Sequence, residues 1–213
     1  MEFLALLWDI AVHLDKHLAA LLAQHGVWVY AILFLIIFAE TGFVVTPFLP
    51  GDSLLFVAGA LCGAGSMDIW VLNGTLIAAA VLGNSVNYSI GRYLGPKVFH
   101  WENSRFFNKA ALMKTHVFYE QHGGKTLVIT RFIPILRTFA PFVAGIGEMT
   151  YVRFQAYNIG GAVLWVGSLS VAGYLFGNLP IIQNNLSLVI LAIIVVSTMP
   201  AAIAYLKHRR APH

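Results

Sequence analysis

Charged residues and cysteine are both scarce in this sequence. Asp, Glu, Lys and Arg together make up 10% of the 213 residues, while hydrophobic residues make up 59%. Soluble domains carry roughly 25% charged residues, so this composition excludes an ordinary soluble domain and indicates a single integral membrane domain. The one cysteine, Cys62, excludes an internal disulfide and any metal cluster built from cysteines.

Histidine is missing from the long hydrophobic parts of the chain. None lies between residues 26 and 99 or between residues 123 and 207, and no cofactor-binding fingerprint occurs. A nucleophile beside a base is therefore not predicted at membrane depth, which argues against an enzyme. His13 and His17 have the i, i+4 spacing of a metal pair, but nothing nearby completes a coordination shell. We expect no cofactor and no metal.

The N-terminal residues 1–25 alternate apolar stretches with polar residues. This pattern predicts an amphipathic helix at the membrane interface. The segment has no basic n-region and no uninterrupted apolar core, so we do not expect it to be a signal peptide.

The basic residues, which give a net charge of +4, are concentrated in membrane-flanking segments. Residues 92–125 form the polar part of the chain and are predicted to be an amphipathic loop on the membrane surface. By the positive-inside rule, this loop and the C-terminal residues 207–210 are cytoplasmic. Basic residues in such positions do not indicate nucleic acid binding.

Three apolar runs are predicted to cross the membrane, namely residues 69–91, 154–177 and 186–206. Because the 92–125 loop and the C-terminus are both expected inside, an even number of crossings must separate them. The last two runs already supply two crossings. Segment 126–147 should therefore return to the side from which it starts.

Segment 126–147 is as long as a transmembrane helix but contains two arginines and two prolines, Arg131, Pro134, Arg137 and Pro141. A guanidinium at mid-bilayer costs roughly 2.5–3.5 kcal/mol on insertion scales. Each interior proline removes a helical hydrogen bond, and irregular backbone at this depth must be buried in protein or line water. The segment is predicted to be a re-entrant hairpin, broken at the prolines, whose tip presents both arginines to an internal cavity.

Segment 27–62 has the same character with the opposite charge. It contains Glu40, Pro47, Pro50 and Asp52 inside an apolar run, and it is also predicted to be a re-entrant hairpin with its tip near residues 46–51.

A weak internal repeat relates the two segments. The sequence Phe56-Val-Ala-Gly59 recurs as Phe142-Val-Ala-Gly145, 86 residues later, and the same offset relates Gly74 to Gly160 and residues 88–91 to 174–177. With the predicted topology, residues 26–91 and 126–178 form an inverted repeat, an arrangement that places transport sites between two broken elements.

The four charges at membrane depth, Glu40, Asp52, Arg131 and Arg137, allow two interpretations. One is a structural ion-pair network, in which Asp52 can also cap a helix that follows Gly51. The other is a transport site. Arginine binds phosphate through a planar fork of donors, and a carboxylate beside it in a low-dielectric cavity can exchange a proton.

The same residues carry a resemblance to the DedA family, which is related to the VTT-domain lipid scramblases, over nearly the full length. The resemblance rests on the following patterns: Glu40-x-Gly42, Pro47-x-x-Pro50-Gly51-Asp52, Gly83-Asn84-x-x-x-Tyr88-x-x-Gly91-Arg92, and Arg131-Phe-x-Pro134-x-x-Arg137-Thr-Phe-x-Pro141-Phe-x-Ala-Gly145. Asn84 departs from many relatives, which have an acid there.

This resemblance implies a bacterial inner-membrane protein with two opposed re-entrant hairpins. It implies movement of lipids across the bilayer, with undecaprenyl phosphate or phosphatidylethanolamine as family substrates. The family's functional acids match Glu40 and Asp52, and its functional arginines match Arg131 and Arg137. The residues expected to shape the hairpins are Gly42, Pro47, Pro50, Gly51, Pro134, Pro141 and Gly145.

The sequence thus predicts an all-α membrane protein with two hairpins, about three transmembrane helices and amphipathic interfacial helices. The favoured function is transport of a phosphate-bearing lipid, with Arg131 and Arg137 binding the head group and Glu40 and Asp52 coupling protons or gating the site. The alternative is a proton-coupled antiporter of small cations or drugs. The expected partners are membrane lipids and protons, and the sequence leaves open whether a homo-oligomer forms.

Overall fold

The computed structural model describes residues 14–43, 51–98, 124–147, 149–183, 185, 188–189 and 191–193, and the elements assigned over these residues are all helical. The helices are α2 (Leu14–His25), α3 (Trp28–Gly42), α4 (Gly51–Gly63), α5 (Ile69–Val98), α7 (Lys125–Ile129), the 3₁₀ helix η1 (Thr130–Phe132), α8 (Pro134–Ile146), α9 (Tyr151–Phe176) and α10 (Pro180–Gln183). The prediction of an all-α protein agrees with these elements.

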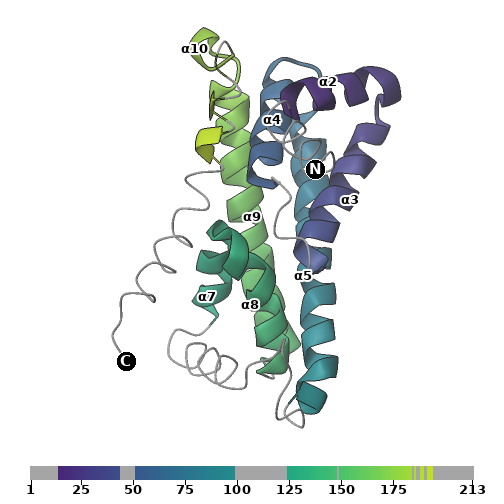
Figure 1. The fold of residues 1–213 in the computed structure, drawn as a ribbon, viewed down its shortest axis with the longest axis vertical. Coiled ribbons are helices and arrows are strands. Elements are labelled where there is room, and N and C mark those ends of the chain that lie inside the picture. The colour runs from purple at the N-terminus through teal and green to yellow at the C-terminus, as the bar shows by residue number, and fades with distance from the viewer. Residues whose placement is uncertain are drawn as a thin grey trace, which may run out of the picture.

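Helices α5 and α9 form the long axis of the molecule. They lie against each other and run in opposite directions (Figure 1). Each contains a stretch of 26 residues, Ile69–Leu94 and Tyr151–Phe176, that is long and apolar enough to cross a membrane. At a rise of 1.5 Å per residue such a stretch measures about 39 Å, which exceeds the hydrocarbon thickness of a bilayer.

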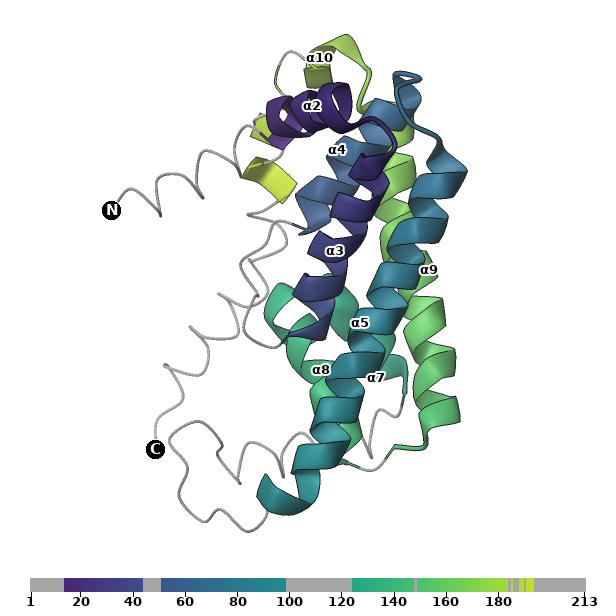
Figure 2. The same ribbon diagram turned by 90° about the vertical axis from the view of Figure 1, so that its right-hand side faces the viewer.

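The shorter helices are divided between the two ends of this pair. Helices α3 and α4 lie beside one half of α5 and α9, while α7 and α8 lie beside the other half (Figures 1 and 2). Helix α3 packs on α5 and α4 packs on α9, whereas α7 packs on α9 and α8 packs on α5. The two halves thus make corresponding contacts with the two long helices exchanged. That α3–α4 and α7–α8 turn back inside a bilayer stays a prediction.

Close glycine contacts define how the two halves correspond. A Cβ atom on Gly59 would lie 2.1 Å from the Ser170 carbonyl oxygen, and one on Gly145 would lie 2.1 Å from the Tyr88 carbonyl oxygen. In return, a Cβ on Gly173 would clash with the carbonyl oxygen of Phe56. Backbones approach this closely only where a side chain is absent.

The same contacts correct the register of the repeat in the long helices. Gly91 packs against the carbonyl oxygen of Phe142 in the same way as Gly173 packs against that of Phe56. Gly91 therefore corresponds to Gly173, which lies 82 residues later in the sequence. The offset of 86 holds between α4 and α8, but the matches of Gly74 with Gly160 and of residues 88–91 with 174–177 do not mark equivalent positions. Small residues recur by chance in apolar helices, and only the packing distinguishes such matches from real ones.

The segment formed by α7, η1 and α8 is interrupted once, between η1 and α8. Ile133 adopts an extended conformation, with φ −118° and ψ 109°, between η1 and α8, and Pro134 begins α8 in the first turn, where no backbone N–H is needed. The prediction that Pro141 also breaks the segment was wrong, because Pro141 lies inside α8. The helix continues through it at the loss of one backbone hydrogen bond, to the carbonyl of Arg137.

The predicted loop at residues 92–125 also begins too early, because α5 continues to Val98. The apolar run ends near Gly91, but helical hydrogen bonding does not require apolar side chains. Several other predictions lie outside the described residues, namely the structure of residues 1–13, Pro47, Pro50, the remainder of the loop to residue 123 and most of the 186–206 span.

Candidate functional site

The α3–α4 segment and the α7–α8 segment meet at the centre of the molecule. They are joined there by an ion-paired cluster around Arg137 of α8. Its Nη1 donates to Oδ1 of Asp52 over 2.7 Å, and its Nη2 donates to Oε1 of Glu40. Glu40, in the last turn of α3, is 0% exposed and Arg137 is 4% exposed. The fork of donors on one guanidinium therefore joins the end of α3, the start of α4 and α8.

The start of α4 is shaped to receive the Glu40 carboxylate. A Cβ atom on Gly51 would lie 2.0 Å from Oε2 of Glu40, so the carboxylate occupies the space that a side chain at this position would need. Gly51 is the first residue of α4 and Asp52 is the next, so both carboxylates lie at the positive end of the helix dipole. The local fold therefore stabilises negative charge where Arg137 binds it.

Trp165 of α9 forms one wall of the cluster. Its indole Nε1 donates to Oδ1 of Asp52 over 2.9 Å, and Cζ of Arg137 lies 4.6 Å from the centre of its ring. Cζ of Arg131 lies 6.0 Å from the same ring. Both arginines are thus in cation–π range of a single fully buried tryptophan.

Arg131, in η1, has different partners from Arg137. It is 2% exposed, and its Nη2 donates to Oδ1 of Asn158 over 2.6 Å. Its Nη1 is buried without a hydrogen-bond partner among the described residues. Over the same residues Arg131 forms no ion pair, so it is a buried cation held by a neutral amide.

Asn87 of α5 joins the two short segments directly. Its Nδ2 donates to the carbonyl oxygens of Thr41 at the end of α3, over 3.1 Å, and of Thr138 in α8, over 2.8 Å. These carbonyls lie one residue from Glu40 and Arg137. The amide therefore fixes the backbone on both sides of the ion pair.

The structure brings together all four charged residues that the sequence singled out, but in an unequal way. Arg137 takes both acids and Arg131 takes neither. Both arginines pack against protein groups, where the sequence predicted a cavity. Asp52 was weighed as a helix cap, and in the structure its carboxylate binds Arg137 and Trp165.

Sequence reasoning missed Trp165 and Asn158. An asparagine within an apolar span is a signal that could have identified Asn158, since such residues are costly in a membrane without a partner. No comparable signal identifies Trp165, because a tryptophan in an apolar helix resembles any core residue.

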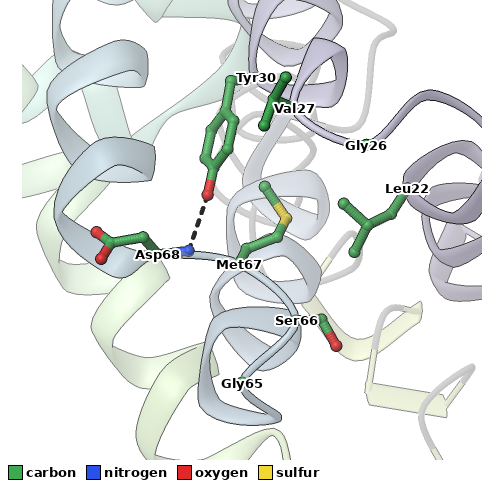
Figure 3. Close-up of a pocket in the computed structure, with 8 residues that line it drawn as sticks. All are labelled: Leu22, Gly26, Val27, Tyr30, Gly65, Ser66, Met67 and Asp68. Atoms are coloured by element: carbon green, nitrogen blue, oxygen red, sulfur yellow. Dashed lines mark hydrogen bonds between the residues drawn. The ribbon is translucent and has the colours of Figure 1, made fainter.

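A cleft at one end of the molecule is not part of this cluster. Leu22 and Met67 are among its lining residues, between α2, α3 and the turn that precedes α5 (Figure 3). The hydroxyl of Tyr30 accepts a 2.8 Å hydrogen bond from the backbone N–H of Asp68. Oδ1 of Asp68 accepts the N–H groups of Trp70 and Val71, so this carboxylate caps α5.

Comparison with known proteins places the chain in a family. Residues 49–175, more than half of the chain, match the VTT domain family. Protein DedA of Escherichia coli K12 is 54% identical over 213 residues, which cover 99% of this chain and 97% of that protein. No solved structure matches.

More distant relatives agree. The uncharacterized membrane protein Rv0364 of Mycobacterium tuberculosis H37Rv is 41% identical over 90% of this chain and 88% of its own length. The inner membrane protein YghB of Escherichia coli K12 is 34% identical over 86% of this chain and 82% of its own. The chain therefore belongs to the DedA family of VTT-domain membrane proteins. The names of these relatives also support the expected multi-pass location in the inner membrane.

Proposed function

We propose that the protein transports a phosphate-bearing lipid, undecaprenyl phosphate or phosphatidylethanolamine, across the bacterial inner membrane. Arg131 and Arg137 bind the head group, and Glu40 and Asp52 couple protons or gate the site. The observation that carries this proposal is Arg131, a buried arginine that has no carboxylate partner and one unused guanidinium nitrogen as far as the described residues go. A buried charge is normally paired, so an uncompensated cation marks a position for an anion.

Phosphate suits this position for chemical reasons. Arginine remains charged at any relevant pH and presents planar donors that match phosphate oxygens. Nη2 of Arg131 is taken by Asn158, and Nη1 has no partner in the part of the chain that the structure describes, so a phosphate oxygen can bind Nη1 without replacing any of the hydrogen bonds described there. Burial strengthens the attraction, because the surroundings are less polarisable than water.

The pairing of Arg137 supports a gating role for the acids. Glu40 and Asp52 together hold both terminal nitrogens of Arg137. A phosphate that binds both arginines must displace at least one of these carboxylates. The displaced acid then needs a proton or a new partner, which links lipid binding to proton movement.

A lipid also needs a place for its chain. An apolar groove runs between α3 and the second half of α5 and is lined by Phe38, Leu82, Val86, Ile90 and Leu94, with Ser85 at its side. Asn84 and Asn87 are neighbours of these residues on α5 and belong to the central cluster. The groove thus lies close to the polar site, as an amphiphile requires.

The alternative function, a proton-coupled antiporter of small cations or drugs, has weaker support. It needs a carboxylate available to a cation, but both acids are bound to Arg137 and a second cation lies on the same tryptophan. A positively charged substrate would be repelled by Arg131.

The test is lipid movement in proteoliposomes that contain the purified protein. A short-chain polyprenyl phosphate and a labelled phosphatidylethanolamine are compared with and without a pH gradient, for the wild type, Arg131→Ala and Arg137→Ala. We expect movement of one lipid by the wild type and a loss of at least about tenfold in each variant, since each removes a charged contact. No movement of either lipid by folded wild-type protein would favour the antiporter, which is then tested with small cations.

A further inference from the structure

A chain of hydrogen-bonded side chains connects Arg131 to one end of the molecule. Oδ1 of Asn158 accepts a hydrogen bond from Arg131. Nδ2 of the same Asn158 side chain donates to Oε1 of Gln155 over 3.1 Å. Nε2 of Gln155 donates to the hydroxyl of Tyr151 over 2.6 Å and to the hydroxyl of Ser85 over 2.7 Å. Every link in this chain is a side-chain polar group.

These side chains lie on facing surfaces of the two long helices. Tyr151, Gln155 and Asn158 are spaced i, i+4 and i+7 and therefore share one face of α9. Asn84 and Ser85 lie on α5, and Nδ2 of Asn84 donates to Oδ1 of Asn158 over 3.0 Å. Polar residues are costly inside membrane-spanning helices, so an array of five between two such helices indicates a function.

Exposure changes steadily along the array. Tyr151, in the first turn of α9, is 46% exposed, Gln155 is half-buried, and Asn158 and Arg131 are each 2% exposed. Two buried atoms along it, Nη1 of Arg131 and Oδ1 of Asn84, have no hydrogen-bond partner among the described residues. The array thus starts at the surface and ends in unused donors and acceptors, as a path for a polar ligand would.

The other half of the molecule lacks an equivalent chain within the described residues. There α5 and α9 are joined by one polar pair, in which the Ser170 hydroxyl donates to Oδ1 of Asn73 over 2.7 Å. Nδ2 of the same Asn73 carboxamide donates to the carbonyl oxygen of Ile69 in its own helix. By the offset of 82 residues, Asn73 is the counterpart of Gln155, yet this pair does not reach either arginine.

We propose that the face formed by Tyr151, Gln155, Asn158, Asn84 and Ser85 is the path by which the charged head group, with its water, reaches Arg131. The path begins at the exposed Tyr151, at the end of the molecule where α5 finishes and α9 begins. Amide and hydroxyl groups replace part of the hydration shell of a phosphate as it moves inward. Gln155 is a positioning residue, since it links the surface tyrosine to the buried asparagine. What travels along the path rests on the proposed function, whereas its contact with water does not.

The first test measures water access with cysteine variants of the full chain in phospholipid vesicles. The variants Tyr151→Cys, Gln155→Cys and Asn158→Cys are made in a Cys62→Ala background. A membrane-impermeant thiol reagent is then added on the side of the membrane at which α9 begins. We expect labelling of all three, at rates that fall from 151 to 158. Val163→Cys, which is exposed on α9 away from the path, and Asn73→Cys should not react from this face. Labelling of position 151 alone, or of none of the three, would overturn the path.

The second test measures movement of a short-chain polyprenyl phosphate in proteoliposomes. Gln155→Leu should slow it about tenfold, because a hydrogen-bonding group on the route of a charged ligand is lost. Gln155→Glu keeps the size and polarity of the side chain but adds a negative charge, so it should also slow an anionic lipid. Asn73→Leu, the matched change in the other half, should leave the rate unchanged, and the thermal midpoint of each variant in detergent reports folding.

The outcomes separate the two proposals. Labelling along the path without movement of any lipid by the wild type would overturn lipid transport and keep the path as a water-filled access route. Wild-type rates in both Gln155 variants would show that the head group does not use this path, even where lipid transport itself is found.

Discussion

Arg137 and Arg131 are six residues apart, are equally buried and lie over the same tryptophan, yet their surroundings differ. Within the described residues, Arg137 is held by two carboxylates, whereas Arg131 is held by one amide and keeps an unused nitrogen. The first arrangement resembles a structural ion pair that holds three helices together. The second leaves a positive charge that no carboxylate among the described residues compensates. Two arginines of one motif can therefore differ in role, because Arg137 also holds three helices together, whereas Arg131 keeps a donor for a ligand.

The largest expected effect comes from breaking the paired arginine. Arg137→Ala leaves Glu40 and Asp52 buried beside each other without a cation, which should cost about 3–5 kcal/mol of stability. The measurement is the midpoint of thermal unfolding in detergent, with Arg153→Ala as a control because Arg153 is exposed on α9. An unchanged midpoint in Arg137→Ala would show that the ion pair does not hold the segments together.

A smaller loss is expected from the tryptophan that both arginines share. Trp165→Phe keeps an aromatic ring under the guanidinium groups but removes the donor to Asp52, at a cost of about 1.5–3 kcal/mol for a hydrogen bond to a charged group. Trp70→Phe on α5 is the matched control, because Trp70 is largely exposed and its side chain should contribute little. Equal midpoints for the two variants would show that the hydrogen bond from the indole to Asp52 does not stabilise the cluster around Arg137.

Asn158→Asp would give Arg131 a carboxylate partner, as Arg137 already has. Asn158→Asp changes one atom of the side chain and places an acid where the amide accepts from Arg131. We expect unfolding to occur at the wild-type temperature or above it, because the buried cation gains a counterion, while movement of a polyprenyl phosphate falls about tenfold or more. If Asn158→Asp folds normally and transports at the wild-type rate, a carboxylate beside Arg131 does not impair transport.

The smallest effect on stability is expected at Arg131 itself. Arg131→Gln removes a buried charge that has no counterion among the described residues, so the free energy of unfolding should change by less than about 1 kcal/mol or rise, in contrast to Arg137→Ala. Lipid movement should nevertheless be lost. A loss of stability as large as that of Arg137→Ala would indicate that both arginines serve the same structural purpose.

Some features of the fold follow from short stretches of sequence. The apolar content and the lengths of the runs at 69–91 and 154–177 predict long membrane-spanning helices, and α5 and α9 occupy these positions. Pro134 predicts an interruption, and the chain is extended just before it. Pro141 was predicted to interrupt the segment as well, but α8 continues through it, because a helix supported by packing on α5 can lose one hydrogen bond and continue.

The candidate site could be predicted in composition but not in pairing. Glu40, Asp52, Arg131 and Arg137 stand out because charges are costly in an apolar environment, wherever the chain folds. Which acid pairs with which arginine depends on long-range contacts. Arg137 lies 85 positions from Asp52 and 97 positions from Glu40 in the sequence. The partner of Arg131 is an uncharged residue, Asn158, so counting charges could not identify it.

The helical class, the membrane location and the four charges that need partners follow from the sequence, because hydropathy, helix-breaking residues and charge act within a single segment. The tertiary structure was needed to show that Arg137 binds both acids, that Arg131 binds an amide, and that α5 and α9 correspond with an offset of 82 residues. These outcomes depend on how each helix is rotated about its axis and how closely glycines such as Gly59 and Gly145 let backbones approach. Rotation and approach are properties of packed pairs of helices, which no single segment encodes.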